Sequence, residues 1–224
     1  ASDISEDGIV CRKLGALDEF QPLKKGLCIV QDESSMLAAR VLDPKPGEFV
    51  IDCCAAPGGK TTHIAELMDN RGIIVAADVH DHKLQLIAEN SARLGIKIIK
   101  PMLIDAREID SEFRNRADRV LVDAPCSGLG VLRRKADLRW KKNPRELPQL
   151  PELQSAILEG AAKCLKSGGV LVYSTCTIER AENEDVVEKF LSTHPEFSLI
   201  EQTTLLPGES DGFFYAKLQL SKDR

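Results

Sequence analysis

The chain has few aromatic residues, and it contains no long hydrophobic run, internal repeat or low-complexity segment. Only 4% of its 224 residues are aromatic, and no apolar stretch approaches the roughly 20 residues that cross a bilayer. Hydrophobic residues make up 43% and charged residues 29%, which excludes disordered, collagen-like and fibrous proteins. We expect one globular domain with a cytoplasmic location and no membrane partner.

Patterns for metal binding and for disulfides are also missing. The seven cysteines include no CxxC pair, and the four histidines form no HExxH motif. Neither a metal site nor a disulfide framework is therefore predicted. The net charge of −5 excludes a protein that binds nucleic acid over its whole surface, so any such contact must be local.

Short apolar segments alternate with helical patterns through the middle of the chain. Strands that are apolar on both faces and alternate with amphipathic helices are typical of a mostly parallel sheet that is covered on both sides. The predicted fold class is therefore α/β, with a doubly wound sheet. The predicted strands are 49–55, 73–79, 98–105, 119–125 and 170–175, and the predicted helices are 60–68, 83–94 and 153–165.

The start of the chain differs from this pattern. Residues 1–30 show no clear period, and we interpret them as a connector that precedes a domain over 31–224. Residues 31–43 begin with Asp32 and Ser34, which are typical of a helix N-terminus, and continue with helical spacing. This predicts a helix packed beside the sheet.

The end of the chain also differs. A helix is predicted near 183–192, and the acidic run 179–188 is interpreted as support for its N-terminus. The apolar segments 197–202 and 212–220 are predicted to pair as an antiparallel hairpin at one end of the sheet.

Small residues follow the first predicted strand. In open α/β sheets, ligands bind beyond the carboxyl ends of the strands, where glycine lets the backbone approach a ligand at a helix N-terminus. A phosphate loop is not predicted, because the spacing to Gly59-Lys60-Thr61 would require glycine where Cys54 stands, and the absence of GxGxxG speaks against a nicotinamide site. The predicted cofactor turn consists of Cys54, Ala55, Ala56, Pro57, Gly58, Gly59 and Lys60.

Carboxylates end the next three predicted strands, at Asp78, Asp105 and Asp123. An acidic side chain at the end of the second strand can accept hydrogen bonds from both hydroxyls of a ribose. Several carboxylates would repel a polyphosphate, but they suit a ribose, an amine and a cationic centre, so S-adenosylmethionine fits better than NAD or ATP. The alternative is that each aspartate only caps the helix that follows it.

Two cysteines stand just beyond predicted strand ends, Cys126 and Cys176. Buried cysteine as a small hydrophobic residue is the alternative. Carbon 5 of a pyrimidine becomes a nucleophile when a thiolate adds to carbon 6, and Asp123 is the candidate to supply a proton at N3 of cytosine. Methyltransferases that act on amines usually carry (N/D)PP(Y/F) after strand four, whereas this chain has Asp-Ala-Pro-Cys. Carbon methylation is therefore favoured.

These motifs resemble the Sun/RsmB (Fmu) family of RNA 5-methylcytosine methyltransferases, the NOL1/NOP2/Sun group. DCCAAPGGKT (52–61), DAPCSGLG (123–130) and STCT (174–177) occur in family order, and QDESSM (31–36) and DGFFYAKL (211–218) resemble the bacterial ribosomal RNA members in particular. The resemblance covers about residues 20–220.

The resemblance implies a Rossmann-like, seven-stranded methyltransferase fold with S-adenosylmethionine contacts along the Cys54–Lys60 turn and at Asp78, Asp105 and Asp123. It also implies that Cys176 is the nucleophile and that Cys126 assists release of the product. Bacterial members are longer, with a helical, NusB-like RNA-binding region before the catalytic domain. We expect that region to be missing here.

A basic stretch supports an RNA partner independently of the resemblance. Residues 133–146 carry seven basic and two acidic side chains around a single tryptophan, as phosphate contacts and base stacking require. The alternative is a solvated charged face with one packed Trp. The predicted RNA contacts are Arg133, Arg134, Lys135, Arg139, Trp140, Lys141 and Lys142.

The sequence therefore predicts an S-adenosylmethionine-dependent RNA cytosine-C5 methyltransferase that acts on 16S ribosomal RNA, at a base that is unstacked or single-stranded. Two alternatives stay open. One is a non-catalytic RNA-binding factor of ribosome assembly on the same fold. The other is a DNA cytosine-C5 methyltransferase, in which Cys126 would be the nucleophile.

Overall fold

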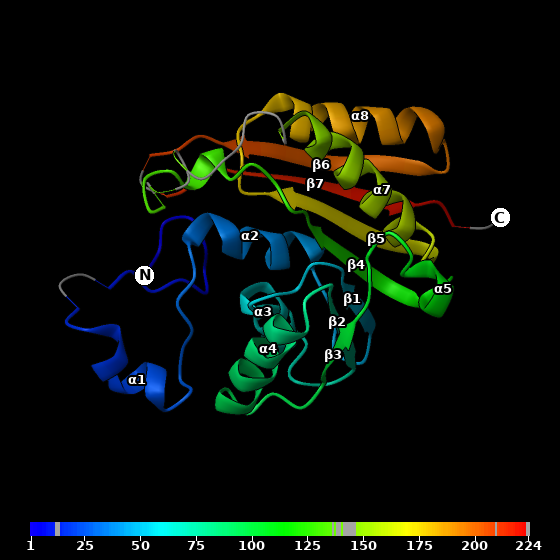
Figure 1. The fold of residues 1–224 in the computed structure, drawn as a ribbon. Coiled ribbons are helices and arrows are strands. Elements are labelled where there is room, and N and C mark those ends of the chain that lie inside the picture. The colour runs from blue at the N-terminus through cyan, green and yellow to red at the C-terminus, as the bar shows by residue number, and fades with distance from the viewer. Residues whose placement is uncertain (12–13, 136, 138–139, 141–146, 209, 223–224) are drawn as a thin grey trace.

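A computed structural model describes residues 1–11, 14–135, 137, 140, 147–208 and 210–222 of the chain. Within them, seven strands form one sheet in the order β3-β2-β1-β4-β5-β7-β6 (Figure 1). Strands β1 to β5 run parallel, and β7 is antiparallel to both β5 and β6. The predicted fold class and the predicted antiparallel pairing are confirmed. The strands are β1 Phe49–Asp52, β2 Ile73–Asp78, β3 Ile99–Leu103, β4 Ala117–Asp123, β5 Leu165–Thr175, β6 Phe197–Leu205 and β7 Phe213–Leu220.

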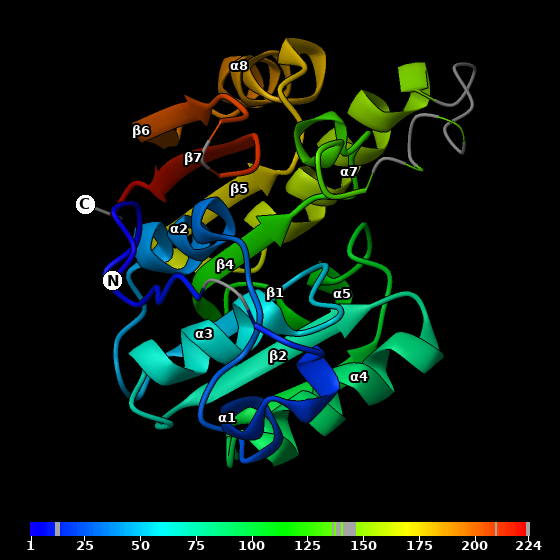
Figure 2. The same cartoon turned by 90° about the vertical axis from the view of Figure 1, so that its left-hand side faces the viewer.

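Helices cover both faces of the sheet (Figures 1 and 2). One face carries α2 (Glu33–Leu42), α3 (Gly59–Leu67) and α4 (Asp81–Arg93), and the other carries α5 (Asp110–Phe113), α7 (Leu150–Ala162) and α8 (Glu184–Thr193). The predicted helix after residue 31 is confirmed as α2, with the Asp32 side chain accepting a hydrogen bond from the backbone of Ser34. Shorter helical turns are η1 Leu17–Glu19, α1 Gln21–Lys24, η2 Leu129–Val131, η3 Leu147–Gln149 and η4 Arg180–Glu182.

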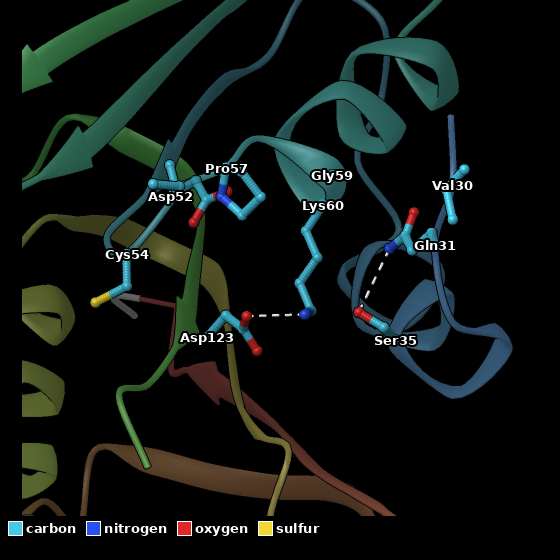
Figure 3. A pocket seen from close by; sticks show the side chains of 11 residues that line it. Val30, Gln31, Ser35, Asp52, Cys54, Pro57, Gly59, Lys60 and Asp123 are labelled. Atoms are coloured by element: carbon cyan, nitrogen blue, oxygen red, sulfur yellow. Dashed lines mark hydrogen bonds and ion pairs between the residues drawn. The ribbon is translucent and has the colours of Figure 1, made fainter. Parts of the chain in front are cut away.

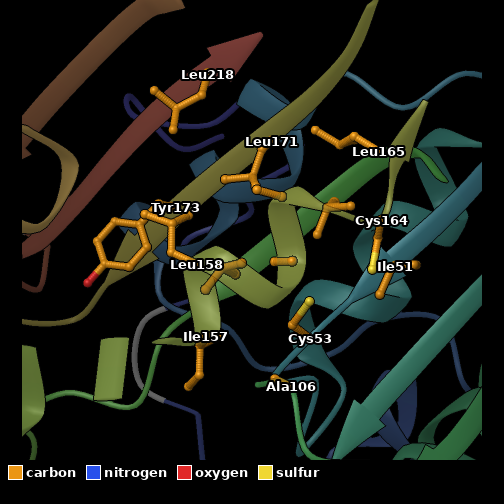
Figure 4. Packing of buried hydrophobic residues seen from close by; sticks show 14 of the residues in the cluster. Ile51, Cys53, Ala106, Ile157, Leu158, Cys164, Leu165, Leu171, Tyr173 and Leu218 are labelled. Atoms are coloured by element: carbon orange, nitrogen blue, oxygen red, sulfur yellow. The ribbon is translucent and has the colours of Figure 1, made fainter. Parts of the chain in front are cut away.

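The core consists of two hydrophobic layers, because successive strand residues point to opposite faces. Val50 packs with α2 to α4, and its neighbour Ile51 packs with the helices of the other face (Figure 4). Burial of such a side chain contributes about 1.5–3 kcal/mol. The strands read as continuous apolar runs in the sequence because both of their faces are covered.

Several predicted strand bounds are wrong. Strand β1 ends at Asp52 rather than at residue 55, and β4 covers Ala117–Asp123 rather than 119–125. Strand β3 ends at Leu103 rather than at residue 105, because the Asp105 side chain accepts hydrogen bonds from the backbone and the guanidinium of Arg107 and starts a turn. Strand β5 begins at Leu165 rather than at residue 170. Its first half contains Lys166 and two glycines, which are typical of a turn, yet Leu165 pairs with Ala117 across a register shift.

The first 30 residues pack against the helices of one face. Asp7 forms an ion pair with Arg40 of α2 and a hydrogen bond with His63 Nε2 of α3, and Arg93 of α4 donates hydrogen bonds to the carbonyls of Leu23 and Cys28. The segment that we interpret as a connector therefore contacts the domain through these polar interactions. The boundary at residue 30 stays a prediction.

Candidate active site

The carboxyl ends of β4 and β5 bring two cysteines together. These strands are parallel neighbours, with Asp123 paired in register with Ser174. The loops that follow them place Cys126 Sγ 3.3 Å from Cys176 Sγ. Two thiols that are 50 positions apart in the sequence are thus in contact at the edge of the sheet where ligands bind in this class of fold.

The two thiols differ in acidity. The hydrogen bond from Cys126 lowers the pKa of the Cys176 thiol; burial and Asp123 oppose this effect, and the positive charges of Lys60 and Lys135 add to it. The pKa of Cys126 is raised well above its usual range. The same hydrogen bond is the largest cause, and burial is the second. Cys176 therefore ionises first, with Cys126 as its hydrogen-bond donor.

Asp123 connects the thiol pair to the turn after β1. Its Oδ2 accepts a hydrogen bond from Lys60 Nζ at 2.8 Å, and its Oδ1 accepts one from Ser174 Oγ at 2.9 Å. Burial alone would lower the pKa of Lys60, but the adjacent Asp123 carboxylate raises it overall. Lys60 is therefore a cation, and both oxygens of Asp123 act as acceptors.

The turn after β1 walls a cavity of about 180 Å³ (Figure 3). The other walls come from the segment before α2, from the start of α3 and from the end of β4. The cavity thus brings together the predicted cofactor turn and the carboxylate that contacts Lys60. The lining residues are Val30, Gln31, Ser35, Asp52, Cys54, Ala55, Ala56, Pro57, Gly59, Lys60 and Asp123.

Gly58 belongs to the predicted turn but is not among the lining residues. It precedes α3 with a φ of +103°, a conformation that glycine adopts without strain and that L residues rarely adopt. Its place in the motif is therefore explained by the sharp turn from β1 into α3.

Asp52, the last residue of β1, is not among the predicted site residues, yet it lines the cavity. Its side chain is buried, and its Oδ2 accepts a hydrogen bond from Thr61 Oγ1 at 2.7 Å. Its Oδ1 makes no hydrogen bond of normal geometry to the part of the chain that the structure describes. Burial raises the pKa of Asp52 to about 7 against the effect of Thr61. Its position at the end of an apolar strand, shared with Asp78 and Asp123, is the sequence signal for it.

Asp78 and Asp105 lie on the same edge of the sheet, beyond the cavity lining. The Asp78 carboxylate accepts a hydrogen bond from the backbone of His80 at 3.0 Å. Hydrogen bonds from Arg107 lower the pKa of Asp105 despite partial burial. Both aspartates thus lie at the edge of the sheet where the cofactor was predicted to bind, but the Asp105 carboxylate already forms an ion pair with Arg107.

The predicted RNA strip lies partly outside the described residues. Two of its arginines contact acidic residues of the domain: Arg134 pairs with Asp32 and Asp211, and Arg133 Nη2 lies 3.8 Å from Asp211. These arginines join the loop after Cys126 to the N-terminus of α2 and to the loop before β7. Outside the description are Arg139, Lys141 and Lys142.

Lys135 and Trp140 belong to the same strip and are exposed. The Trp140 side chain is 89% exposed, so it is not a core residue. Lys135 contributes to the lowered pKa of Cys176, which means that its charge acts at the thiol pair. Both residues are therefore open to a ligand, and Lys135 acts at the thiol pair.

The described residues contain neither a membrane-spanning helix nor a cluster of metal ligands. No helix there is long and apolar enough to cross a membrane. The same residues contain no group of three or more His, Cys, Asp or Glu side chains that could hold a metal ion.

Comparison with known proteins places this site in a family. The family described as 16S rRNA methyltransferase RsmB/F matches residues 39–219. The chain belongs to the RsmB/F family. The resemblance inferred from the motifs is thus confirmed, and the match extends over the sheet and both cysteine loops.

Curated relatives of this RsmB/F chain are about twice as long. It is 49% identical over 196 residues to the probable ribosomal RNA small subunit methyltransferase B of Bacillus subtilis, covering 87% of this chain and 44% of the relative. It is 40% identical over 213 residues to the ribosomal RNA small subunit methyltransferase B of Yersinia pseudotuberculosis, covering 91% and 49%. The chain therefore spans about half the length of these relatives.

Solved structures agree on the fold. The structure of NSun6 from Pyrococcus horikoshii with SFG has a TM-score of 0.85 and 38% identity, and the match covers 94% of this chain and 57% of that one. A methyltransferase homolog from Pyrococcus horikoshii has a TM-score of 0.81 and 31% identity, with 92% and 72% covered. The Rossmann-like methyltransferase fold is confirmed.

Proposed function

We propose that this chain is the catalytic domain of an S-adenosylmethionine-dependent methyltransferase that acts on carbon 5 of a cytosine in 16S ribosomal RNA. The observation that carries the proposal is the Cys126–Cys176 pair, 3.3 Å apart, in the loops that follow β4 and β5. The hydrogen bonds of Asp123 to Lys60 and Ser174 link these strand ends to the cavity walled by the turn after β1. The names of the relatives support small-subunit ribosomal RNA as the substrate. Residues 31–224 form the catalytic domain in this proposal.

The cofactor is S-adenosylmethionine, which supplies an activated methyl group on a sulfonium centre. The Cys54–Lys60 turn and Asp123 line the cavity that would receive it. Asp78 and Asp105, on the same edge of the sheet beyond that lining, are assigned to its ribose and its adenine end. The relative solved with the S-adenosylmethionine analogue SFG supports this assignment.

Cys176 starts the reaction in this proposal. Its thiolate adds to carbon 6 of the cytosine, the electrons of the 5,6 double bond move into the ring, and N3 takes a proton. We assign the donation to Asp123: the Lys60 ammonium, which is hydrogen-bonded to Oδ2, passes a proton to the carboxylate, the carboxyl group delivers it to N3, and Lys60 is left neutral. Carbon 5 is then nucleophilic enough to accept the methyl group.

Cys126 completes the reaction. After methyl transfer, a base must remove the proton from carbon 5, so that the electrons can re-form the double bond and expel the Cys176 thiolate from carbon 6. The Cys126 sulfur lies 3.3 Å from the Cys176 sulfur, the atom that has to leave carbon 6. The directions of the two pKa shifts agree with these roles: Cys176, whose pKa is lowered, attacks, and Cys126, whose pKa is raised, is the stronger base once its own proton has passed to solvent. In a DNA-type enzyme the roles of the two sulfurs would be reversed.

RNA contact is assigned to the basic strip after the Cys126 loop. Lys135 and Trp140 are exposed there, and they suit phosphate contact and base stacking. Arg133 and Arg134 are held by Asp211 and Asp32, so we propose that they shape the strip and contact phosphate through their exposed edges. Arg139, Lys141 and Lys142 complete the proposed set.

Product analysis tests the proposal. The chain is incubated with 16S ribosomal RNA and S-adenosylmethionine that carries a labelled methyl group, and the RNA is digested to nucleosides for mass spectrometry. We expect the label in 5-methylcytidine and in no other nucleoside, and its loss with Cys176→Ala. Label in N4-methylcytidine, or in RNA treated with Cys176→Ala, would contradict carbon-5 chemistry. No label from a chain that binds the cofactor and the RNA would favour the assembly-factor alternative.

A further inference from the structure

Two consecutive polar residues, Glu182 and Asn183, lie buried behind the thiol pair. Their exposed fractions are 4% and 0%. They fall within the acidic run whose predicted role is to support the N-terminus of α8. Glu184 and Asp185 do occupy the first turn of that helix, as this interpretation requires. Glu182 and Asn183 have a different environment and call for a different explanation.

Glu182 holds the loop that carries Cys126 through hydrogen bonds. Its Oε2 accepts hydrogen bonds from the backbone N–H of Ser127 at 2.8 Å and from Gln154 Nε2 at 2.9 Å. The same amide of Gln154 donates to the carbonyl of Pro125 at 3.0 Å. The residues on both sides of Cys126 are thus fixed to one carboxylate and its amide partner.

Asn183 does the same for the loop that carries Cys176. Its Oδ1 accepts a hydrogen bond from Thr175 Oγ1 at 2.6 Å, and its Nδ2 donates to the carbonyl of Thr177 at 3.1 Å. Asparagine at a helix N-cap usually accepts a hydrogen bond from the first turn, but the Asn183 side chain makes no such bond to α8. Its hydrogen-bonding capacity goes to both neighbours of Cys176 instead.

Two further hydrogen bonds join these attachments. Ser127 Oγ lies 2.8 Å from Thr177 Oγ1, which links the two loops directly. The Tyr173 hydroxyl, from the buried part of β5, donates to the carbonyl of Glu182 at 2.6 Å (Figure 4). The backbone that holds both loops is therefore itself anchored to the sheet.

The buried charge makes a purely structural role costly. Among the described residues, no Lys or Arg forms an ion pair with Glu182, so its carboxylate depends on hydrogen bonds alone for its stabilisation. A buried carboxyl group costs free energy unless hydrogen bonds compensate it, and an apolar residue of similar size would not carry that cost. The benefit of Glu182 lies in what its hydrogen bonds position.

We infer that Glu182 and Asn183 are positioning residues that set the separation of the two thiols, Glu182 by holding the Cys126 loop and Asn183 by holding the Cys176 loop. Because they are adjacent in the chain, one segment of backbone fixes both loops at once. The assignment of an effect on release to Glu182 and on addition to Asn183 rests on the proposed function. The effect on thiol geometry does not.

Thiol reactivity without RNA provides the first test. The rate at which iodoacetamide alkylates Cys176 is measured against pH by peptide mass spectrometry in Glu182→Ala, Asn183→Ala, Glu182→Gln and Asn183→Asp. Glu188→Ala is the matched control, because Glu188 lies on α8 in an exposed ion pair with Arg180. We expect the midpoint to rise in both alanine variants, to return towards the parent value in Glu182→Gln, which keeps an acceptor oxygen, and to stay unchanged in Glu188→Ala. Unchanged midpoints in both folded alanine variants would overturn the inference.

The covalent protein–RNA adduct provides the second test. We expect Glu182→Ala to slow its decay and Asn183→Ala to slow its formation, each by roughly tenfold to a hundredfold, the effect of a misplacement of about 1 Å. Equal effects of both variants on both steps would overturn the separate roles. If an alanine variant does not fold, Gln154→Ala, which removes the amide that joins Glu182 to Pro125, carries both tests for Glu182, and Asn183→Asp, which loses the donor to the Thr177 carbonyl, carries them for Asn183. No adduct in Cys126→Ala, in which release is blocked, would refute the proposed function, while the alkylation profiles would still decide the positioning role.

Discussion

At the scale of single residues, a substitution of Asp78 measures how much a carboxylate at a strand end contributes to cofactor binding. It ends β2, and it accepts a hydrogen bond from the backbone of His80, so its carboxylate is held on the rim without a covalent role. Asp78→Ala should weaken S-adenosylmethionine binding by about 1.5–3 kcal/mol, the range for hydrogen bonds to a charged group. Calorimetry measures this, with the exposed Asp69→Ala as the control. Equal affinity of Asp78→Ala and the parent chain would refute the role.

Asp52 makes stability depend on pH. Burial raises its pKa from 3.8 to about 7 in the folded chain, so the folded chain binds more protons than the unfolded chain between these values. The free energy of unfolding therefore falls as pH rises through this window, by up to about 1.4 kcal/mol per pH unit. Asp52→Asn removes this dependence, and it should gain stability relative to the parent as pH rises from about 4 to about 7. Urea unfolding across this window measures the difference, and a constant difference would contradict the burial argument.

At the scale of elements, the loop after β4 contains basic residues of two kinds. Arg134 contacts Asp32 and Asp211, both nearly buried, and burial raises the pKa of Asp211 with a further contribution from Asp32. Arg134→Ala leaves these carboxylates facing each other, so it should cost about 1–3 kcal/mol of stability. Lys135→Ala should leave stability unchanged and weaken RNA binding in a salt-dependent way. Melting and RNA-binding measurements on both variants test the distinction, and an equal loss of stability in the two would contradict it.

The elements show why part of the site could be predicted and part could not. Strands β1, β2 and β4 were predictable because their side chains are apolar on both faces, and the strand-end position indicated Asp78 and Asp123 directly. Strand β5 begins with residues that are typical of a turn, so its first half could not be predicted from the sequence. Charge along the sequence does not distinguish a basic residue that pairs with carboxylates of the domain, such as Arg134, from a basic residue that is exposed to solvent, such as Lys135.

Contacts between distant segments were the least accessible to sequence. Glu182 and Asn183 look like part of a helix-capping acidic run, and only the fold brings them to the two cysteine loops. The burial of Asp52 likewise depends on how α3 and β4 close over the end of β1.

At the scale of the whole molecule, the chain spans about half of its curated relatives. We predict that it binds S-adenosylmethionine normally but methylates RNA poorly. The reason is that the RNA-binding region implied by the family resemblance would increase the affinity for RNA beyond what the basic strip provides. The kcat/KM for 16S ribosomal RNA is compared between this chain and one extended by that region. Equal values would contradict the prediction.

The central claim is that the two thiols have separate roles, and trapping of the covalent adduct tests it most directly. Cys126→Ala and Cys176→Ala are each incubated with 16S ribosomal RNA and S-adenosylmethionine, then separated by denaturing gel electrophoresis. If Cys176 adds to carbon 6 and Cys126 acts only in release, Cys126→Ala accumulates a cofactor-dependent protein–RNA complex that survives denaturation, and Cys176→Ala forms none. A stable complex from Cys176→Ala with none from Cys126→Ala would contradict the account and reverse the two roles.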